Sequence, residues 1–145
     1  MNKIKFMAKD IFHETVKKAL EKEGWTITHD PYYLNDKIKN IKYEVDLGAE
    51  KLLAAERNSE KIAVEIKSFT KISFRHEFHS VLGQYLIYYK GLCQIEPERQ
   101  LFLAMPSFAY NRLQTHPFLL EIVEDYKVKL IIFDDQNEKL ILWKK

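Results

Sequence analysis

Two stretches of the chain repeat their apolar residues with the period of an amphipathic helix. The first covers residues 7–23 and is followed by Gly24, a residue type favoured just past a helix end. The second covers residues 76–90 and is followed by Gly91. Its apolar positions are Phe78, Val81, Leu82, Tyr85, Leu86 and Tyr89. We predict a helix over each stretch, with each glycine just after the helix end.

Most of the remaining chain shows the alternation or short apolar runs of β-strands. Residues 49–57 contain good helix formers, but the polar turn that follows makes a hairpin equally plausible, and we favour a strand there. A loop is expected from Asp30-Pro31 to about Asn40, and a third helix over residues 115–124. Strands are predicted over residues 25–29, 41–47, 61–69, 101–105, 128–133 and 139–143, the last two as a hairpin. Without residues 49–57, the predicted order is α-β-β-β-α-β-α-β-β.

Composition and charge limit the classes of protein that this chain can be. With 145 residues, 46% apolar and only four Gly and four Pro, we expect one α/β domain over residues 1–145. The single Cys93 and the lack of an apolar leader or long apolar run indicate a soluble, cytoplasmic protein with no membrane segment. The net charge of +2 is too small for a general attraction to nucleic acid, so any contact with DNA must be local.

The strand predicted over residues 61–69 is apolar except at Glu65 and Lys67. Because side chains alternate along a strand, these two charges project from the same face. A carboxylate inside an apolar strand is unfavourable unless it is paired or binds a cation. The pattern alone is equally compatible with a salt bridge on an exposed strand face.

Asp46 stands near the end of the preceding strand and would bring a second carboxylate if the chain folds back as a hairpin. Two carboxylates and the carbonyl oxygen of Ile66 would form an oxygen site for Mg²⁺ or Mn²⁺. Lys67 would then orient or deprotonate the attacking water and offset phosphate charge. This set of residues favours phosphodiester cleavage.

Other polar residues have both a functional and an ordinary interpretation. Glu14 on the first helix and Gln84 on the second are positions from which such a site would recruit help, although each is also typical of a solvated helix face. His13 is a further candidate at the mouth of the site. For His76 and His79, the alternatives are metal binding and a surface or capping role. For Lys71, Arg75 and Lys90, they are phosphate contacts and an ordinary solvated position.

The chain resembles the PD-(D/E)XK nuclease superfamily at Asp46 and at Glu65-Ile66-Lys67, with Val45 in place of the proline of the motif. Gln84 and Tyr88 are similar to a Gln-x-x-x-Tyr helix motif found in some of these nucleases. The resemblance implies a restriction endonuclease-like α/β core, a mixed β-sheet flanked by helices, with Asp46, Glu65, Lys67, Glu14 and Gln84 at the catalytic site.

More closely, the chain resembles the cyanobacterial XisH family, fdxN element excision controlling factors of heterocyst development. The similarity lies in residues 8–14, 45–50, 55–56, 62–69 and 79–85. It implies a role in DNA rearrangement together with a XisI-like partner protein, and a site-specific recombinase is a further candidate partner. A homodimer is a separate expectation, because a nuclease that cuts both strands needs two sites. Two hypotheses stay open: a metal-dependent endonuclease, and a non-catalytic regulatory module that binds DNA or protein. An antitoxin-like or phage-defence component is a third.

Overall fold

The computed structural model describes residues 10–53 and 58–145. Its elements are α2 (His13–Lys22), β1 (Thr26–His29), β2 (Tyr32–Asp36), β3 (Ile41–Val45), β4 (Leu47–Leu53), β5 (Asn58–Ile66), α3 (Phe74–Ile95), β6 (Arg99–Pro106), α4 (Ser107–Gln114), α5 (Pro117–Asp125), β7 (Leu130–Asp134) and β8 (Lys139–Lys144). The terminal hairpin, the first strand and the charged strand are confirmed as elements, and residues 49–53 form a strand as favoured.

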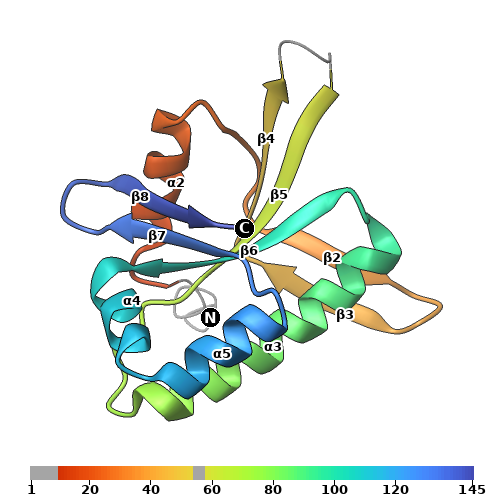
Figure 1. The fold of residues 1–145 in the computed structure, drawn as a ribbon. Coiled ribbons are helices and arrows are strands. Elements are labelled where there is room, and N and C mark those ends of the chain that lie inside the picture. The colour runs from red at the N-terminus through yellow and green to blue at the C-terminus, as the bar shows by residue number, and fades with distance from the viewer. Residues whose placement is uncertain (1–9, 54–57) are drawn as a thin grey trace, which may run out of the picture.

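Six strands form one mixed sheet in the order β1-β4-β5-β6-β7-β8 (Figure 1). Strands β5, β6 and β7 run parallel to one another, and the other pairs are antiparallel. The charged strand β5 is therefore central, as its apolar sequence predicts. Strands β2 and β3 form a separate two-stranded ladder that packs beside α3.

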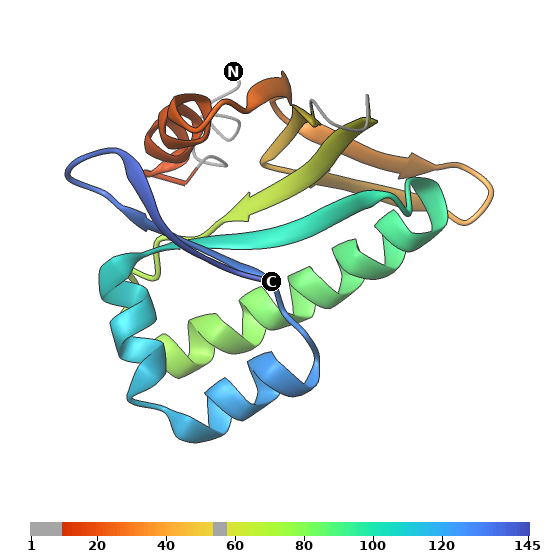
Figure 2. The same cartoon turned by 45° about the horizontal axis from the view of Figure 1, so that its top comes forward.

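Helices cover both faces of the sheet, which confirms a mixed α/β fold. Figure 2 shows α2 on one face and α3 and α5 on the other. Each face has its own apolar core: one joins α2 to the sheet around the stacked rings of Trp25 and Trp143, and the other joins the sheet to α3, α4 and α5. The strands between these cores are buried on both sides, which explains their continuous apolar runs.

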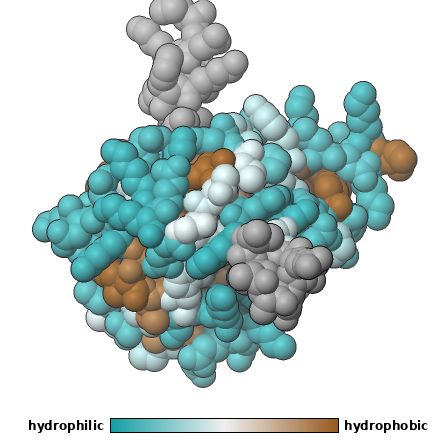
Figure 3. Space-filling view, turned by 90° about the horizontal axis from the view of Figure 1, so that it is seen from above, coloured by the Kyte–Doolittle hydropathy of each residue, from teal (hydrophilic) through white to brown (hydrophobic). Residues whose placement is uncertain are grey.

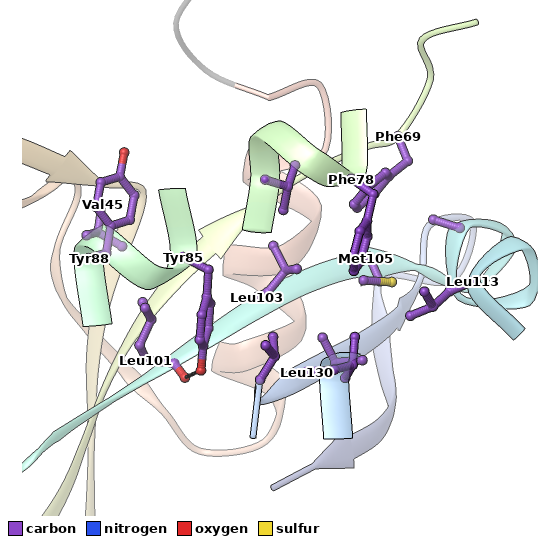
Figure 4. Close-up of a cluster of buried hydrophobic side chains, with 14 of the residues drawn as sticks. Val45, Phe69, Phe78, Tyr85, Tyr88, Leu101, Leu103, Met105, Leu113 and Leu130 are labelled. Atoms are coloured by element: carbon purple, nitrogen blue, oxygen red, sulfur yellow. Dashed lines mark hydrogen bonds between the residues drawn. The ribbon is translucent and has the colours of Figure 1, made fainter. Parts of the chain in front are cut away.

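Figure 4 shows the larger core, where α3 lies on the sheet. Tyr85 is buried there, and its hydroxyl has two backbone partners. It donates to the carbonyl oxygen of Leu101 across 3.2 Å and accepts from the N–H of Lys129 across 3.1 Å. A buried hydroxyl with both roles satisfied fixes the helix against β6 without leaving an unpaired polar atom.

The first helix begins later than predicted. Residues 10–12 are not helical, and residues 7–9 lie outside the described part of the chain. Asp10 accounts for this start, because its Oδ1 accepts from the N–H of Phe12 across 2.9 Å and its Oδ2 accepts from the N–H of Ser68 across 2.8 Å. The side chain thus ties the helix start to the chain just after β5 instead of extending the helix.

The loop expected before Asn40 is wrong, because β2 occupies part of it. This strand pairs with β3 in a regular antiparallel register from Tyr32 opposite Val45 to Asp36 opposite Ile41. The single strand predicted over residues 41–47 is in fact two strands in two different sheets, interrupted at Asp46. Local pattern does not reveal this, because long-range pairing decides which sheet each half joins.

Helix α3 continues through Gly91 to Ile95, so the predicted end at this glycine is wrong. Its core-facing positions also differ from the predicted stripe: Tyr88 is buried, whereas Leu86 and Tyr89 are exposed. The helix is apolar on more than one side, so the period alone does not fix which side is buried. Residues 54–57, expected to continue a strand, lie outside the described residues.

The other boundary differences are smaller. Helix α4 was not predicted, since only Ala109 and Leu113 mark its buried face. Helix α5 begins at Pro117, two residues later than expected, and β5 ends at Ile66.

Seen from above, the surface is mostly hydrophilic, with apolar residues in a few separate patches (Figure 3). Among the described residues, no helix is long and apolar enough to cross a membrane.

Candidate functional site

Asp46 is the single residue at which the chain passes from β3 in the small ladder to β4 in the large sheet. Strand β4 pairs with β5 so that Leu47 lies opposite Val64. Continuing this antiparallel register by one residue places Asp46 opposite Glu65. The change of sheet thus leaves an acidic residue beside the buried carboxylate of the central strand.

Backbone hydrogen bonds hold the side chains of Asp46 and Glu65 in position. The N–H of Asp46 donates to Oε1 of Glu65 across 3.3 Å, and the N–H of Ile66 donates to Oδ2 of Asp46 across 2.7 Å. Lys67 Nζ lies 3.4 Å from Oε2 of Glu65. Asp46, Glu65 and Lys67 therefore form one cluster, as the sequence predicts.

The salt bridge between Glu65 and Lys67 is not on an exposed strand face. Glu65 is only 7% exposed, so its charge has lost nearly all contact with water. Burial, followed by the neighbouring Asp46 charge, raises the pKa of Glu65 to about 8. Burial also raises the pKa of Asp46, against the effect of its hydrogen bond from Ile66. The pair therefore favours uptake of a proton or a cation near neutral pH.

A cavity of about 570 Å³ opens beside the cluster. Its wall includes Asp46, Glu65, Lys67, His13, Asp30, Gln84, Tyr88 and residues of β3. A second cavity of about 300 Å³ meets the same three charged residues and adds Asp10, Ile66 and Lys71. The carboxylate pair is thus reachable from two directions. Tyr88 is close enough that the two carboxylates, after burial, raise its pKa.

Two buried side-chain atoms in the described part of the chain have no hydrogen-bond partner: Nδ1 of His13 and Oε1 of Gln84. Both residues line the larger cavity with Asp46 and Glu65. Buried polar atoms are almost always paired, so an unpaired one indicates a missing water, ion or ligand. The cavity is therefore a candidate functional site.

The residues at this site fit a divalent cation. Two carboxylates side by side offer the hard oxygen ligands that Mg²⁺ and Mn²⁺ prefer, and Ile66 lines the smaller cavity next to them. A cation would also replace the proton that burial and mutual repulsion favour on Glu65. Its chemical contribution would be to polarise a phosphate oxygen and lower the pKa of a bound water.

The two supporting residues predicted from sequence differ in position. Gln84 lines the cavity, whereas Glu14 is exposed on the first turn of α2 and is absent from its wall. The ligand atoms of Glu14 group instead with those of His13 and Asp30, within 4.8 Å of one another. His13 lines the cavity, in agreement with its proposed place at the site mouth.

Other candidates lie farther from the carboxylates. His76 and His79 are neighbours on α3, with ring centres 6.2 Å apart. The side chain that caps this helix is that of Ser73, whose Oγ accepts from the backbone N–H of His76. Both histidine side chains are exposed, which agrees with a surface role. Lys71 lines the smaller cavity, and Lys90 lines a separate groove. Arg75 is exposed.

Sequence reasoning missed Asp10 and Asp30. Asp30 accepts from His13 Nε2 across 2.7 Å and from Lys17 Nζ across 3.0 Å. Burial raises the pKa of Asp30, but hydrogen bonds from Lys17 and His13 outweigh it and leave the pKa below its ordinary value. The contact joins α2 to the segment after β1, so no spacing of residues in the local sequence predicts it.

The chain is similar to known proteins over most of its length. A family model described as "XisH protein" matches residues 6–141. No curated protein matches the sequence. Two crystal structures are similar, each with a TM-score of 0.82 and 38% identity, covering 94% of this chain and 100% of the other. One is an XisH family protein from Nostoc punctiforme PCC 73102, and the other is an fdxN element excision controlling factor protein from Anabaena variabilis. The chain belongs to the XisH family.

Proposed function

We propose that this protein is a metal-dependent DNA endonuclease-like factor that controls excision of a DNA element, as in the programmed site-specific rearrangement of heterocyst development. The observation that carries the proposal is the pairing of Asp46 with the buried Glu65, with Lys67 beside them in an open cavity. The family supports the biological setting, because a relative is named an fdxN element excision controlling factor.

The fold supports a restriction endonuclease-like core. The acidic residues meet where β4 pairs with the central strand β5, and helices cover both faces of the mixed sheet. This is the position at which the PD-(D/E)XK resemblance expects them. Fold alone does not establish cleavage, so the argument for activity depends on the side chains.

In the proposed reaction, Asp46, Glu65 and the carbonyl oxygen of Ile66 hold Mg²⁺ or Mn²⁺. The cation, when bound, supplies a phosphate-polarising charge and an acidified water. Lys67 is placed to orient that water and to offset the charge that develops on the phosphate. Its Nζ lies 3.4 Å from Oε2 of Glu65, so the carboxylate holds the ammonium group at the site.

The proposed partners are DNA and a XisI-like protein, with a site-specific recombinase as a further one. A homodimer would bring two sites to the two strands of a duplex. With no strong net charge, DNA would be held by local lysines such as Lys42, which lines the larger cavity, and Lys71.

The alternative is a non-catalytic regulatory module that acts by binding DNA or its partner protein. An apolar groove of about 440 Å³ between α3 and β3 favours it. Leu86, Ile87 and Tyr43 are partly exposed along this groove, and Lys39 and Lys90 line it as well. These features suit an apolar ridge flanked by acidic residues on a XisI-like protein.

Cleavage of supercoiled plasmid and of branched DNA tests the two functions. The reactions contain Mg²⁺ or Mn²⁺, with and without a XisI-like protein, and compare the unaltered chain with Lys67→Ala. We expect cation-dependent cleavage that falls by about 100-fold or more in the variant. Lys18→Ala is the matched control, because Lys18 is exposed on α2 away from the cavity.

Cleavage at equal rates by the unaltered protein and by Asp46→Asn would exclude this site as its source. A protein that binds its partner and DNA but cuts neither substrate under any of these conditions would support the regulatory module.

A further inference from the structure

His13 is almost fully buried on α2, with an exposed fraction of 4%, yet its two ring nitrogens differ sharply. Nε2 lies 2.7 Å from a carboxylate oxygen of Asp30, whereas Nδ1 is buried and has no partner. Leaving a buried ring nitrogen unpaired costs the hydration that the atom loses on folding. An imidazole held on one side and unpaired on the other is therefore unlike an ordinary packed histidine.

The contacts of Asp30 determine where the imidazole proton lies. Asp30 also accepts from Lys17 across 3.0 Å, so its carboxylate is held in the charged form and acts only as an acceptor. His13 must then donate its Nε2 proton to Asp30. In the neutral ring this leaves Nδ1 as a bare lone pair, fixed in direction by the carboxylate. This is the arrangement by which carboxylates orient histidines at metal sites.

The lone pair belongs to a residue in the wall of the cavity that holds Asp46 and Glu65. His13 and Asp46 border the same cavity. The ligand atoms of His13 nonetheless group within 4.8 Å with those of Glu14 and Asp30, and not with the carboxylate pair. Direct binding of one ion by all three residues would require closer spacing, whereas a bound water spans the extra distance.

We propose that His13 is the third side chain of the cation site, accepting through Nδ1 a hydrogen bond from a water of the hydrated cation held by Asp46 and Glu65. Asp30 is the positioning residue that fixes the imidazole. The inference rests on the proposed cation site and adds to it a nitrogen acceptor. It also places the functional residue of this helix at His13 instead of Glu14.

Nitrogen-15 spectra of the histidine side chains test this in the unaltered protein, without any cleavage assay. For the neutral ring in metal-free protein we expect the His13 proton on Nε2 and the lone pair on Nδ1. Addition of Mg²⁺ should shift the Nδ1 resonance together with the backbone amides of Asp46 and Ile66. Asp30→Asn should remove the preference for the Nε2–H form.

Calorimetric Mg²⁺ binding gives an independent readout. Both His13→Gln and Asp30→Asn should weaken binding by about 10-fold. His79→Gln, which changes an exposed histidine of α3 outside the cavity wall, should leave it unchanged. Retention of the thermal unfolding transition in Asp30→Asn separates weakened binding from loss of the fold.

Three results would overturn the proposal. The first is a His13 ring protonated at Nδ1 in the metal-free protein. The second is a response of Asp46 and Ile66 to Mg²⁺ while His13 stays unchanged, which would leave the cation site intact without this residue. The third is the lack of any response at all, which would remove the cation site and this inference together.

Discussion

The N–H of Asp46 donates to Oε1 of Glu65 across 3.3 Å, while the N–H of Ile66, next to Glu65, donates to Oδ2 of Asp46 across 2.7 Å. Each carboxylate is therefore held by the backbone of the opposite strand. The two acidic groups have no freedom to separate unless the chain around β4 and β5 also moves. Their repulsion is thus built into the folded state and should be visible in its stability.

Glu65→Gln should change how stability depends on pH in metal-free buffer. Burial and then Asp46 raise the pKa of Glu65 from 4.5 to about 8, so between these values the folded protein keeps a proton that the unfolded chain has released. The contribution is complete below pH 4.5 and is lost as pH rises through about 8. Measured by urea unfolding, the free energy of unfolding should decline by up to about 1.4 kcal/mol per pH unit between these two pKa values. In Glu65→Gln this decline should be smaller.

Glu98→Gln is the matched control for this measurement, because Glu98 is exposed before β6. It should reproduce the pH dependence of the unaltered protein. An unchanged slope in Glu65→Gln would contradict the raised pKa of the buried Glu65 carboxyl.

The acidic cluster was predictable because a charge inside an apolar strand is a local signal. Glu65 and Lys67 interrupt β5, and alternation along the strand places them on the same face. The contact between His13 and Asp30 has no such signal. It joins residues 17 positions apart, one in α2 and one in the segment after β1, and only the packing of α2 beside β1 brings them together.

Local sequence predicts an element correctly where local signals are sufficient, and incorrectly where pairing or packing with distant residues decides the structure. The terminal hairpin has strong alternation and a polar turn, so local sequence is sufficient for it. Strand β2 is defined by its pairing with β3, and its own sequence predicts a loop. The sequence also predicts the end of α3 at Gly91, because glycine is common just past a helix end, but the helix continues to Ile95. In the structure this glycine permits close packing inside the helix. No local sequence rule distinguishes such a glycine from one that lies just past a helix end.

Gly83 and Gly91 lie in the same helix and allow a matched test of that interpretation. A Cβ at Gly83 would meet no atom within 4 Å, so Gly83→Ala should raise the free energy of unfolding by about 0.5 to 1 kcal/mol through helix propensity alone. A Cβ at Gly91 would lie 2.7 Å from Cδ2 of the fully buried Leu34. Gly91→Ala should therefore lower stability by about 1 kcal/mol or more.

Chemical denaturation of the two variants measures this difference directly. A double variant that adds Leu34→Val to Gly91→Ala should recover part of the loss, because it shortens the side chain that the new methyl meets. Equal stabilisation by both glycine replacements would show that Leu34 moves away freely and that Gly91 is not required for packing.

Arg99 should be essential to the stability of the sheet away from the site. Its side chain is buried, donates to Glu96 across 2.7 Å and to the carbonyl oxygen of Ile62 across 2.8 Å, and stacks over Tyr32 at 4.7 Å. Arg99→Met would leave both acceptors without this donor. We expect a loss of about 2 to 3 kcal/mol in the free energy of unfolding.

Arg75→Met is the control for Arg99, since Arg75 is an exposed residue in the first turn of α3. Its unfolding free energy should change by less than about 0.5 kcal/mol. A similar small change in Arg99→Met would mean that the buried ion pair contributes no more than an apolar side chain of comparable length.

Gln84 offers a way to separate a functional polar group from a structural one. Its Oε1 is buried without a partner in the wall of the larger cavity. Gln84→Met removes this atom without breaking an oxygen-accepted hydrogen bond, so stability should stay constant or rise by up to about 1 kcal/mol. If the amide binds the substrate or its water, DNA cleavage should nevertheless fall by about 10-fold.

Gln94→Met is the matched change for Gln84, because Gln94 lies on the same helix but lines the apolar groove instead of the site. It should leave cleavage unchanged. At Gln84→Met we expect a lower cleavage rate together with an equal or higher free energy of unfolding. This combination is typical of a polar atom that is left unpaired for function. A loss of stability with an unchanged rate would instead make Gln84 a structural residue of α3, and the cavity would then lose one of its two unpaired groups.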